Sequence, residues 1–220
     1  MALRAVALLL CARAAASSEA FLQQECKAVS LQQGFDLEAF ASKPWYVQQQ
    51  MATRYLPEEQ NFCVSAEYTV LDKRTLWGYT VRVHNRAEEA DGTLHDSGSA
   101  LCARGTDASE PAKLEVGPCF LPRVRGVSTG PYWVLAYSEE EGFALVSGGQ
   151  PKTQTPGGCR TGSGVNGAGL WIFTRQQQRS DALVAKVRGI AQAQGFDLSV
   201  LADVKQDSCQ PQTAPALLRI

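Results

Sequence analysis

The chain has 220 residues, of which 45% are hydrophobic and 20% charged, and its formal net charge is −1. This composition is too apolar for a disordered protein, and the balanced charge offers no basic footprint for a nucleic acid. The sequence contains two histidines, which excludes a histidine-rich metal site. The length predicts one domain with tails.

The first 20 residues have the pattern of a secretory signal peptide. A positive start precedes an apolar run of eight residues, 5–12, and small residues follow it. A membrane anchor is the alternative, but it needs about 20 apolar residues, and Arg13 interrupts this stretch. We therefore expect a secreted protein with a signal peptide over 1–20, one domain over 21–210 and a flexible tail over 211–220.

Six cysteines remain once the predicted signal peptide is removed. They are Cys26, Cys63, Cys102, Cys119, Cys159 and Cys209. An even number in an oxidising compartment predicts three disulfides, although six cysteines permit 15 connectivities.

From residue 45 to residue 174 the sequence reads as short strands separated by turn residues. Residues 64–70 alternate in polarity, and so do residues 77–85, where one face would carry Trp77, Tyr79, Val81, Val83 and Asn85. Further strand candidates are 97–103, 112–117, 132–137, 143–147 and 169–174. Many short strands at this spacing predict a β-sandwich or a β-barrel.

One segment after the strands has helical periodicity. Ser180 suits the N-cap, and Gly195 supplies a stop. Between them, Leu183, Val184, Val187, Ile190 and Ala191 form one apolar stripe. A helix with a single apolar stripe should pack on the outside of the sheet.

Several motifs that could carry chemistry have simpler explanations. Residues 162–167 match G-x-G-x-x-G, but a strand-like segment follows where a dinucleotide site needs a helix, so a flexible loop is favoured. His84 and His95 are expected on the surface, since neither lies near a nucleophile in a recognised motif. The acidic runs 88–89 and 139–141 read as solvated turns. We predict no catalytic residue, no metal and no cofactor, apart from any bound hydrophobic ligand or pigment.

The order of several motifs resembles the lipocalin family, and most closely the apolipoprotein D group with its bacterial and plant relatives. The motifs are Phe35-Asp-Leu37, Lys43-Pro-Trp-Tyr46, Ala90-Asp-Gly-Thr93, Glu110 to Val116, Pro131 to Ala136 with Gly142 to Val146, and Leu170 to Arg175. Two positions depart from the family pattern. Lys43 stands at the glycine of Gly-x-Trp, and Tyr137-Ser-Glu-Glu140 replaces Thr-Asp-Tyr. The resemblance implies an all-β fold: an eight-stranded antiparallel up-and-down barrel with one C-terminal helix packed outside it.

The resemblance also implies a disulfide pattern. It pairs Cys63 with Cys209 and Cys26 with Cys159. The remaining Cys102 and Cys119 lie on candidate neighbouring strands, where a cross-strand bridge fits. The alternative is that one pair is reduced or differently matched.

The resemblance places ligand-contacting positions inside the barrel. Because Cys63 must face outward to reach the tail, Val64, Ala66, Tyr68 and Val70 should face inward. Tyr68, Asn85 and Trp171 match ligand-contacting positions of the apolipoprotein D group, and Leu121 lies close to another. Trp77 and Tyr79 are expected behind them. Aromatic walls with a few polar groups suit an apolar ligand, although the same aromatics could instead fill the barrel as core.

The implied function is the binding and transport, or sequestration, of a small hydrophobic molecule. Fatty acids or lysolipids, sterols, carotenoid or retinoid-like isoprenoids and bilins are all compatible. The alternatives are a de-epoxidase-like lipocalin enzyme acting on an isoprenoid, and a filled-barrel scaffold subunit of a larger, photosynthetic complex. We expect a secreted monomer or weak dimer, with peripheral membrane or protein-complex association left open. A thylakoid-lumen location in an alga is the alternative compartment.

Overall fold

The structure is a computed structural model in which residues 25–210 are described. The predicted signal peptide and the predicted tail lie outside this range. Within it, no helix has both the length and the apolar character needed to cross a membrane.

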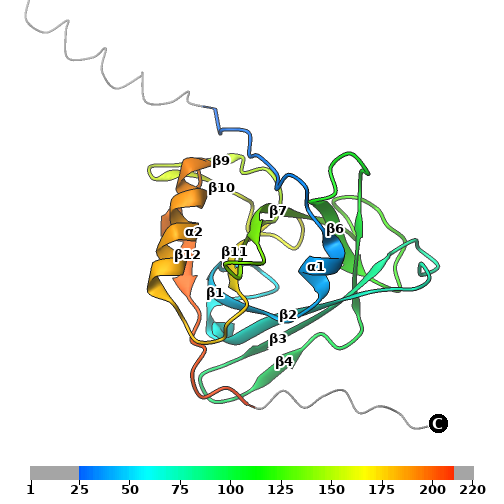
Figure 1. Ribbon diagram of the computed structural model, residues 1–220, viewed down its shortest axis with the longest axis horizontal. Helices are drawn as coiled ribbons and strands as arrows, with labels where there is room; N and C mark the ends of the chain where they lie inside the picture. The colour runs from blue at the N-terminus through cyan, green and yellow to red at the C-terminus, as the bar shows by residue number, and fades with distance from the viewer. Residues whose placement is uncertain (1–24, 211–220) are drawn as a thin grey trace, which may run out of the picture.

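Eight antiparallel strands close into a barrel, as the resemblance predicts (Figure 1). In chain order they are β1 (Trp45–Met51), β2 (Phe62–Val70), β3 (Val81–Glu88), β4 (Leu94–Asp96) continued by β5 (Leu101–Gly105), β6 (Lys113–Pro118), β7 (Gly130–Ser138), β8 (Phe143–Ser147) and β11 (Leu170–Thr174). The ring closes where β1 pairs with β11, with Tyr46 opposite Thr174 and Gln50 opposite Trp171.

The remaining elements lie around the barrel. They are α1 (Leu37–Ala41), the 3-10 turns η1 (Glu58–Gln60) and η2 (Leu198–Val200), the hairpin β9 (Thr153–Thr155) and β10 (Gly158–Arg160), the helix α2 (Asp181–Ala193) and the strand β12 (Leu201–Asp203), which pairs with β1. The sequence prediction missed α1, β1, β4, the β9–β10 hairpin and β12. All except β1 are too short to produce a periodic signal, and β1 contains a bulge that interrupts its alternation.

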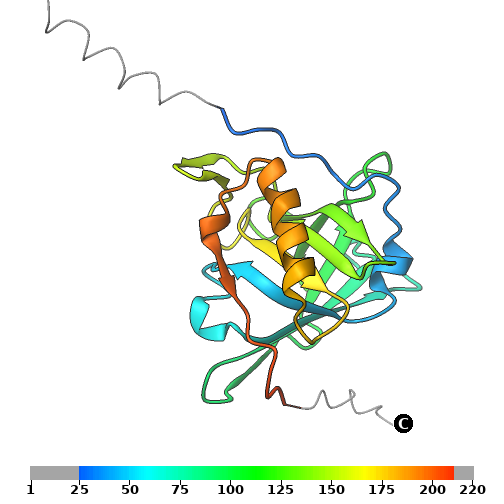
Figure 2. The same ribbon diagram turned by 60° about the vertical axis from the view of Figure 1, so that its left-hand side comes forward.

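The predicted helix is correct in position and role. The Ser180 side chain accepts a hydrogen bond from the Leu183 amide, and Gly195 takes the positive φ that ends the helix. Figure 2 shows α2 lying across the outer surface of the barrel. Val187 and Ala191 are fully buried there against Leu145 and Ile172. The helix covers the outer face of β8 and β11 and the barrel interior covers the inner face, so both strands are buried throughout.

A second apolar cluster fills the inside of the barrel. Val64, Ala66 and Tyr68 of β2 belong to it, which confirms their predicted inward direction. Val70 was also expected inside, but its side chain is 40% exposed because β2 ends there and the chain turns away. At one end, α1 and the segment before it close the barrel, since Phe35 and Phe40 pack into this interior cluster.

Three disulfides join the described cysteines in the pattern that the resemblance implies: Cys26–Cys159, Cys63–Cys209 and Cys102–Cys119. The first two close long loops of the chain and tie its ends to the barrel. In the chain-entropy model such loops stabilise a fold by about 4–5 kcal/mol each.

Candidate functional site

Three aromatic side chains form a layer within the barrel interior. The hydroxyls of Tyr68 and Tyr132 lie 2.5 Å apart, and the Tyr132 ring stacks on the Trp171 ring with centroids 6.4 Å apart. These side chains come from β2, β7 and β11, so the layer spans the barrel from wall to wall. Tyr68 and Trp171 are the two predicted ligand residues that the structure brings together.

The two hydroxyls of this layer stay neutral at physiological pH. Burial raises the pKa of Tyr68, and the hydrogen bond from Tyr132 and the charge of Arg175 offset this only in part. Burial also raises the pKa of Tyr132, and the neighbouring Tyr68 and Tyr55 raise it further. One hydroxyl donates to the other, so the pair keeps one proton that it can donate elsewhere.

A polar pair lies next to this aromatic layer. Gln50 pairs across the sheet with Trp171, and directly opposed residues share a face, so Gln50 is on the interior side of β1. Its Nε2 donates to Oδ1 of Asn61 at 2.6 Å, and both side chains are buried. The other two amide atoms, Gln50 Oε1 and Asn61 Nδ2, have no hydrogen-bond partner.

These two unpaired atoms point to a ligand or a water. A buried amide atom without a partner costs about 1–3 kcal/mol. One of the two atoms is an acceptor and the other a donor, so together they suit a hydroxyl, a carboxyl or a water molecule. The pair is therefore the polar component of an otherwise aromatic and aliphatic interior.

The position of Trp171 depends on a glycine. The φ of Gly169 is +115°, and a Cβ added there would lie 2.0 Å from the indole ring. Nearby, the Tyr55 hydroxyl donates to the Ala168 carbonyl at 3.1 Å. Tyr55 comes from the β1–β2 loop and is half exposed, so this loop lies beside the aromatic layer.

Four predicted ligand residues lie outside this group. Leu121 is 39% exposed in the β6–β7 loop, and Trp77 is half-buried in the β2–β3 loop, where its Nε1 donates to the Phe120 carbonyl. Asn85 is exposed beside the break between β4 and β5, and its backbone bonds with Ser97.

Tyr79 is fully buried, but on the outer face of the barrel wall. Its hydroxyl approaches Gly117 of β6, whereas the alternate residues Leu114 and Val116 face the interior cluster. The expected inward face of 77–85 is therefore wrong for Tyr79 and correct for Val81 and Val83. The reason is that β3 begins only at Val81, after Gly78 has turned the chain with a φ of +77°.

Sequence reasoning missed Tyr132, Gln50 and Asn61. The strand candidate 132–137 contained Tyr132, and alternation along it could have placed the ring inside. Gln50 could not have been placed, because it follows two other glutamines and β1 has a bulge between Val47 and Gln49 that shifts the alternation.

The closed end of the barrel is organised by one arginine. The Arg175 guanidinium lies 3.6 Å from the centre of the Trp45 ring and donates to Glu139 at 2.8 and 3.0 Å. It also donates to the carbonyls of Ala39 and Phe40 in α1. This network joins β11, β1 and α1 at a single side chain that is 7% exposed.

The two departures from the family pattern meet at this end. Lys43 Nζ lies 3.2 Å from Glu139, and the Tyr137 hydroxyl donates to the same carboxylate. Partial burial pushes the pKa of Glu139 up, but hydrogen bonds from Arg175, Lys43 and Tyr137 outweigh this and hold it below its usual value. The two replacements therefore complement each other.

The other residues considered for chemistry lie where the sequence analysis expects them. His84 and His95 are partly exposed and contact Asp96 and Glu89, each at 2.7 Å. Residues 162–167 form a loop closed by a hydrogen bond between the ends, which leads into β11 rather than into a helix. Among the residues that the structure describes, no group of three or more His, Cys, Asp or Glu side chains could hold a metal ion.

Two of the hollows on the described part of the chain lie outside the barrel. One, of about 420 Å³, has a polar lining that includes Arg86, Glu88 and Gln206. The other, of about 540 Å³, lies beside Cys26 and Gln150. Neither includes a residue of the aromatic layer.

No protein-family model matches the sequence, and no curated protein matches it. Solved structures do match. Lobster apocrustacyanin A1 superposes with a TM-score of 0.54 and 16% identity over 84% of this chain and 91% of that one. Insecticyanin of the tobacco hornworm Manduca sexta superposes with a TM-score of 0.55 and 19% identity over 86% of this chain and 90% of that one. The cockroach allergen Per a 4 superposes with a TM-score of 0.52 and 13% identity over 83% of this chain and 96% of that one. With its closed eight-stranded barrel and its flanking helix, this chain has the lipocalin fold.

Proposed function

We propose that this protein binds a small hydrophobic molecule non-covalently inside its barrel and carries or sequesters it. The observation that carries the proposal is the pair of unpartnered atoms, Gln50 Oε1 and Asn61 Nδ2, beside Trp171 in an apolar interior. The lipocalin fold and the aromatic layer support it. An apolar ligand body would gain about 25 cal/mol for each Å² that it buries.

The polar pair narrows the class of ligand. A pure hydrocarbon would leave both amide atoms without a partner, whereas a ligand with a hydroxyl, carbonyl or carboxyl group would satisfy at least one of them. Fatty acids or lysolipids, sterols, hydroxylated isoprenoids and bilins all carry such a group. We propose that the polar end of the ligand lies at Gln50 and Asn61 and that its apolar body lies along Tyr132 and Trp171.

Entry of the ligand requires the aromatic layer to open. Tyr55 lies in the β1–β2 loop beside this layer, and its hydroxyl donates to the Ala168 carbonyl. The segment between β8 and β11 contains Gly169, whose missing side chain leaves room for the Trp171 ring. We propose that these two loops move apart to admit the ligand.

The first experiment is native mass spectrometry of the purified protein with extraction of co-purifying lipid. A molecule bound at one per chain would support the carrier and identify its class. The second is titration with retinol and cis-parinaric acid, followed by tryptophan quenching. Gln50→Leu with Asn61→Leu should weaken binding of both probes about tenfold, as the loss of one hydrogen bond would. Gln49→Leu is the matched control, because Gln49 faces outward and bonds with Asp203.

A filled-barrel scaffold is the second candidate, and one observation favours it. The rings of Phe40, Trp45, Tyr68 and Tyr137 pack with centroids 5.2–5.9 Å apart, which occupies the closed half of the interior. If the protein is isolated empty and neither probe quenches its tryptophans, the scaffold replaces the carrier.

We propose no catalytic step and no cofactor. All six cysteines within residues 25–210 are in disulfides, so none of them is a free thiol nucleophile. The same disulfides fit an oxidising compartment, and we propose that the protein is secreted. The motif order leads us to propose that, among lipocalins, its nearest relationship is to the apolipoprotein D group.

A further inference from the structure

Large exposed apolar side chains gather on two neighbouring loops. The β2–β3 loop, 71–80, carries Leu76, which is 89% exposed. The β6–β7 loop, 119–129, carries four more: Phe120, Leu121, Val124 and Val127, which are 39–74% exposed. We call these two segments the paired loops. Apolar residues that gather on one surface in this way mark an interaction site rather than ordinary surface.

Side-chain and backbone contacts hold the paired loops together. Trp77 Nε1 donates to the Phe120 carbonyl at 3.2 Å, and Arg123 Nε donates to the Trp77 carbonyl at 2.5 Å. The Cys102–Cys119 disulfide fastens the start of the second loop to β5. Leu76 and Phe120 therefore belong to one surface.

A buried ionic group lies beneath them. Glu115, on the outer face of β6, receives hydrogen bonds from Arg104 at 2.8 Å and from Arg123 at 3.1 Å. The buried Tyr79 ring fills the space next to it. Because Arg123 also donates to the Trp77 carbonyl, this group links both loops to the barrel wall.

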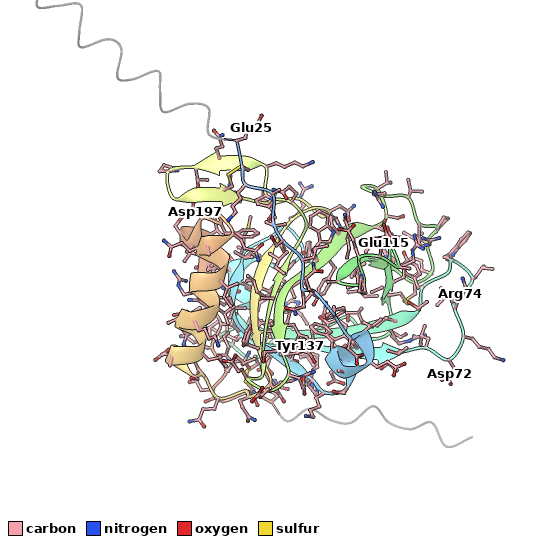
Figure 3. All side chains as sticks on the ribbon, turned by 45° about the horizontal axis from the view of Figure 1, so that its top comes forward. Glu25, Asp72, Arg74, Glu115, Tyr137 and Asp197 are labelled. Carbon is pink, nitrogen blue, oxygen red and sulfur yellow. A yellow bond between two sulfur atoms is a disulfide. The ribbon has the colours of Figure 1, made fainter. Side chains whose placement is uncertain are left out.

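The charge of the paired loops differs from that of the whole chain. The chain has a net charge of −1, whereas the paired loops contain Lys73, Arg74, Arg123 and Arg125 against the single acid Asp72. Arg123 is used by Glu115, which leaves three exposed cations around the apolar side chains. Figure 3 places Arg74 and Glu115 on the side of the molecule away from Asp197 and α2.

We propose that the paired loops dock this protein on the surface of an anionic lipid bilayer. The apolar side chains would enter the boundary between headgroups and acyl chains, and the surrounding cations would contact lipid phosphates. The charge favours this occupant, because Lys73, Arg74 and Arg125 are exposed and complement the phosphates of an anionic bilayer. This inference does not depend on the proposed carrier function, since none of its residues belongs to the aromatic layer or to the Gln50–Asn61 pair.

Vesicle co-sedimentation of the full chain tests the proposal. Vesicles of phosphatidylcholine with about 30% phosphatidylserine have a negative surface potential and should bind the protein. Vesicles of phosphatidylcholine alone should bind it less. Leu76→Ser with Phe120→Ser should abolish sedimentation. Arg125→Glu should weaken it by at least about fivefold, the effect of losing one cation near the membrane. Salt should weaken wild-type binding.

Matched controls lie elsewhere on the surface. Leu94→Ser removes an exposed leucine of β4, and Lys152→Glu reverses an exposed charge next to β9; both should sediment like the wild type. Circular dichroism identifies any variant that fails to fold. Trp77 gives an independent readout, because vesicles should shift its fluorescence to the blue and Trp77→Phe should remove that shift.

Three outcomes would overturn the proposal. The first is a wild-type protein that does not bind anionic vesicles. The second is equal loss of binding in the Leu94→Ser control. The third is a concentration-dependent dimer that Leu76→Ser with Phe120→Ser abolishes while vesicles remain unbound, since the paired loops would then be a contact between two copies of the chain.

Discussion

The closed end of the barrel and the region around Trp171 both contain buried polar groups, but they satisfy them differently. At the closed end, every nitrogen of the Arg175 guanidinium donates to Glu139 or to a carbonyl. Near Trp171, Gln50 and Asn61 satisfy only half of their amide atoms. The first arrangement is what stability alone would favour. In the second arrangement two buried amide atoms lack a partner, and a ligand that bonds with them would remove that energetic cost. The comparison therefore separates the part of the interior that stabilises the fold from the part that we propose binds a ligand.

The largest expected effect is at the closed end. Arg175→Ala should lower the free energy of unfolding by about 3 kcal/mol, because it removes a buried cation and leaves the Glu139 carboxylate without its main partner. Urea denaturation measures this. The control, Arg125→Ala, removes an exposed arginine and should change stability by less than about 0.5 kcal/mol. Equal stability of the two variants would show that Arg175 does not hold the closed end.

The next largest effect on stability is expected near Trp171. Gly169→Ala should cost about 2 kcal/mol, since alanine is strained at a φ of +115°. The new Cβ should also displace the indole of Trp171, which near-UV circular dichroism and tryptophan emission would report. Gly164→Ala is the control, because nothing lies within 4 Å of its added Cβ. An unchanged tryptophan spectrum in Gly169→Ala would contradict the packing described for Trp171.

A smaller effect of opposite sign is expected from the polar pair. Gln50→Leu with Asn61→Leu should leave stability unchanged or raise it by up to about 1 kcal/mol, because two unpaired amide atoms disappear with their partners. Gln49→Leu should lower stability, since Gln49 bonds with both Asp203 and Arg188. If the double variant is strongly destabilised, the pair is structural and the carrier proposal loses its main support.

The smallest effect is on pH dependence. The pKa of Glu139 is held below its usual value, so its contribution to stability is complete above the usual pKa of a glutamate and is lost as pH falls through the lowered value. The side chain is a third exposed, so the loss should stay below about 1 kcal/mol. Thermal unfolding between pH 7 and pH 3 should show a shallower acid decline in Glu139→Gln than in the wild type. Identical profiles would mean that the carboxylate is not stabilised in the folded state.

How far the sequence predicted the site depended on strand regularity. In β2, strict alternation placed Val64, Ala66 and Tyr68 correctly, because the strand keeps its period through these positions. In β1 the bulge after Val47 moves Gln50 to the inside, and three consecutive glutamines give no apolar pattern from which to detect it. At Tyr79 the predicted alternation included a residue that precedes the strand, because β3 begins only at Val81. Errors therefore arose where the backbone departs from period two.

By itself, the sequence predicted an all-β sandwich or barrel, the outer helix with its Ser180 cap and the direction of the regular strands, because these follow from periodicity and from local capping chemistry. The resemblance to lipocalins added the eight-stranded barrel and the disulfide pairing. Only the tertiary structure decided which polar atoms stay unpaired beside Trp171, that Lys43 and Glu139 compensate each other, and that two loops far apart in sequence form one apolar and cationic surface. The physical reason is that these properties belong to pairs of residues from different strands. Their relative positions depend on bulges, turns and barrel closure, which no local pattern encodes.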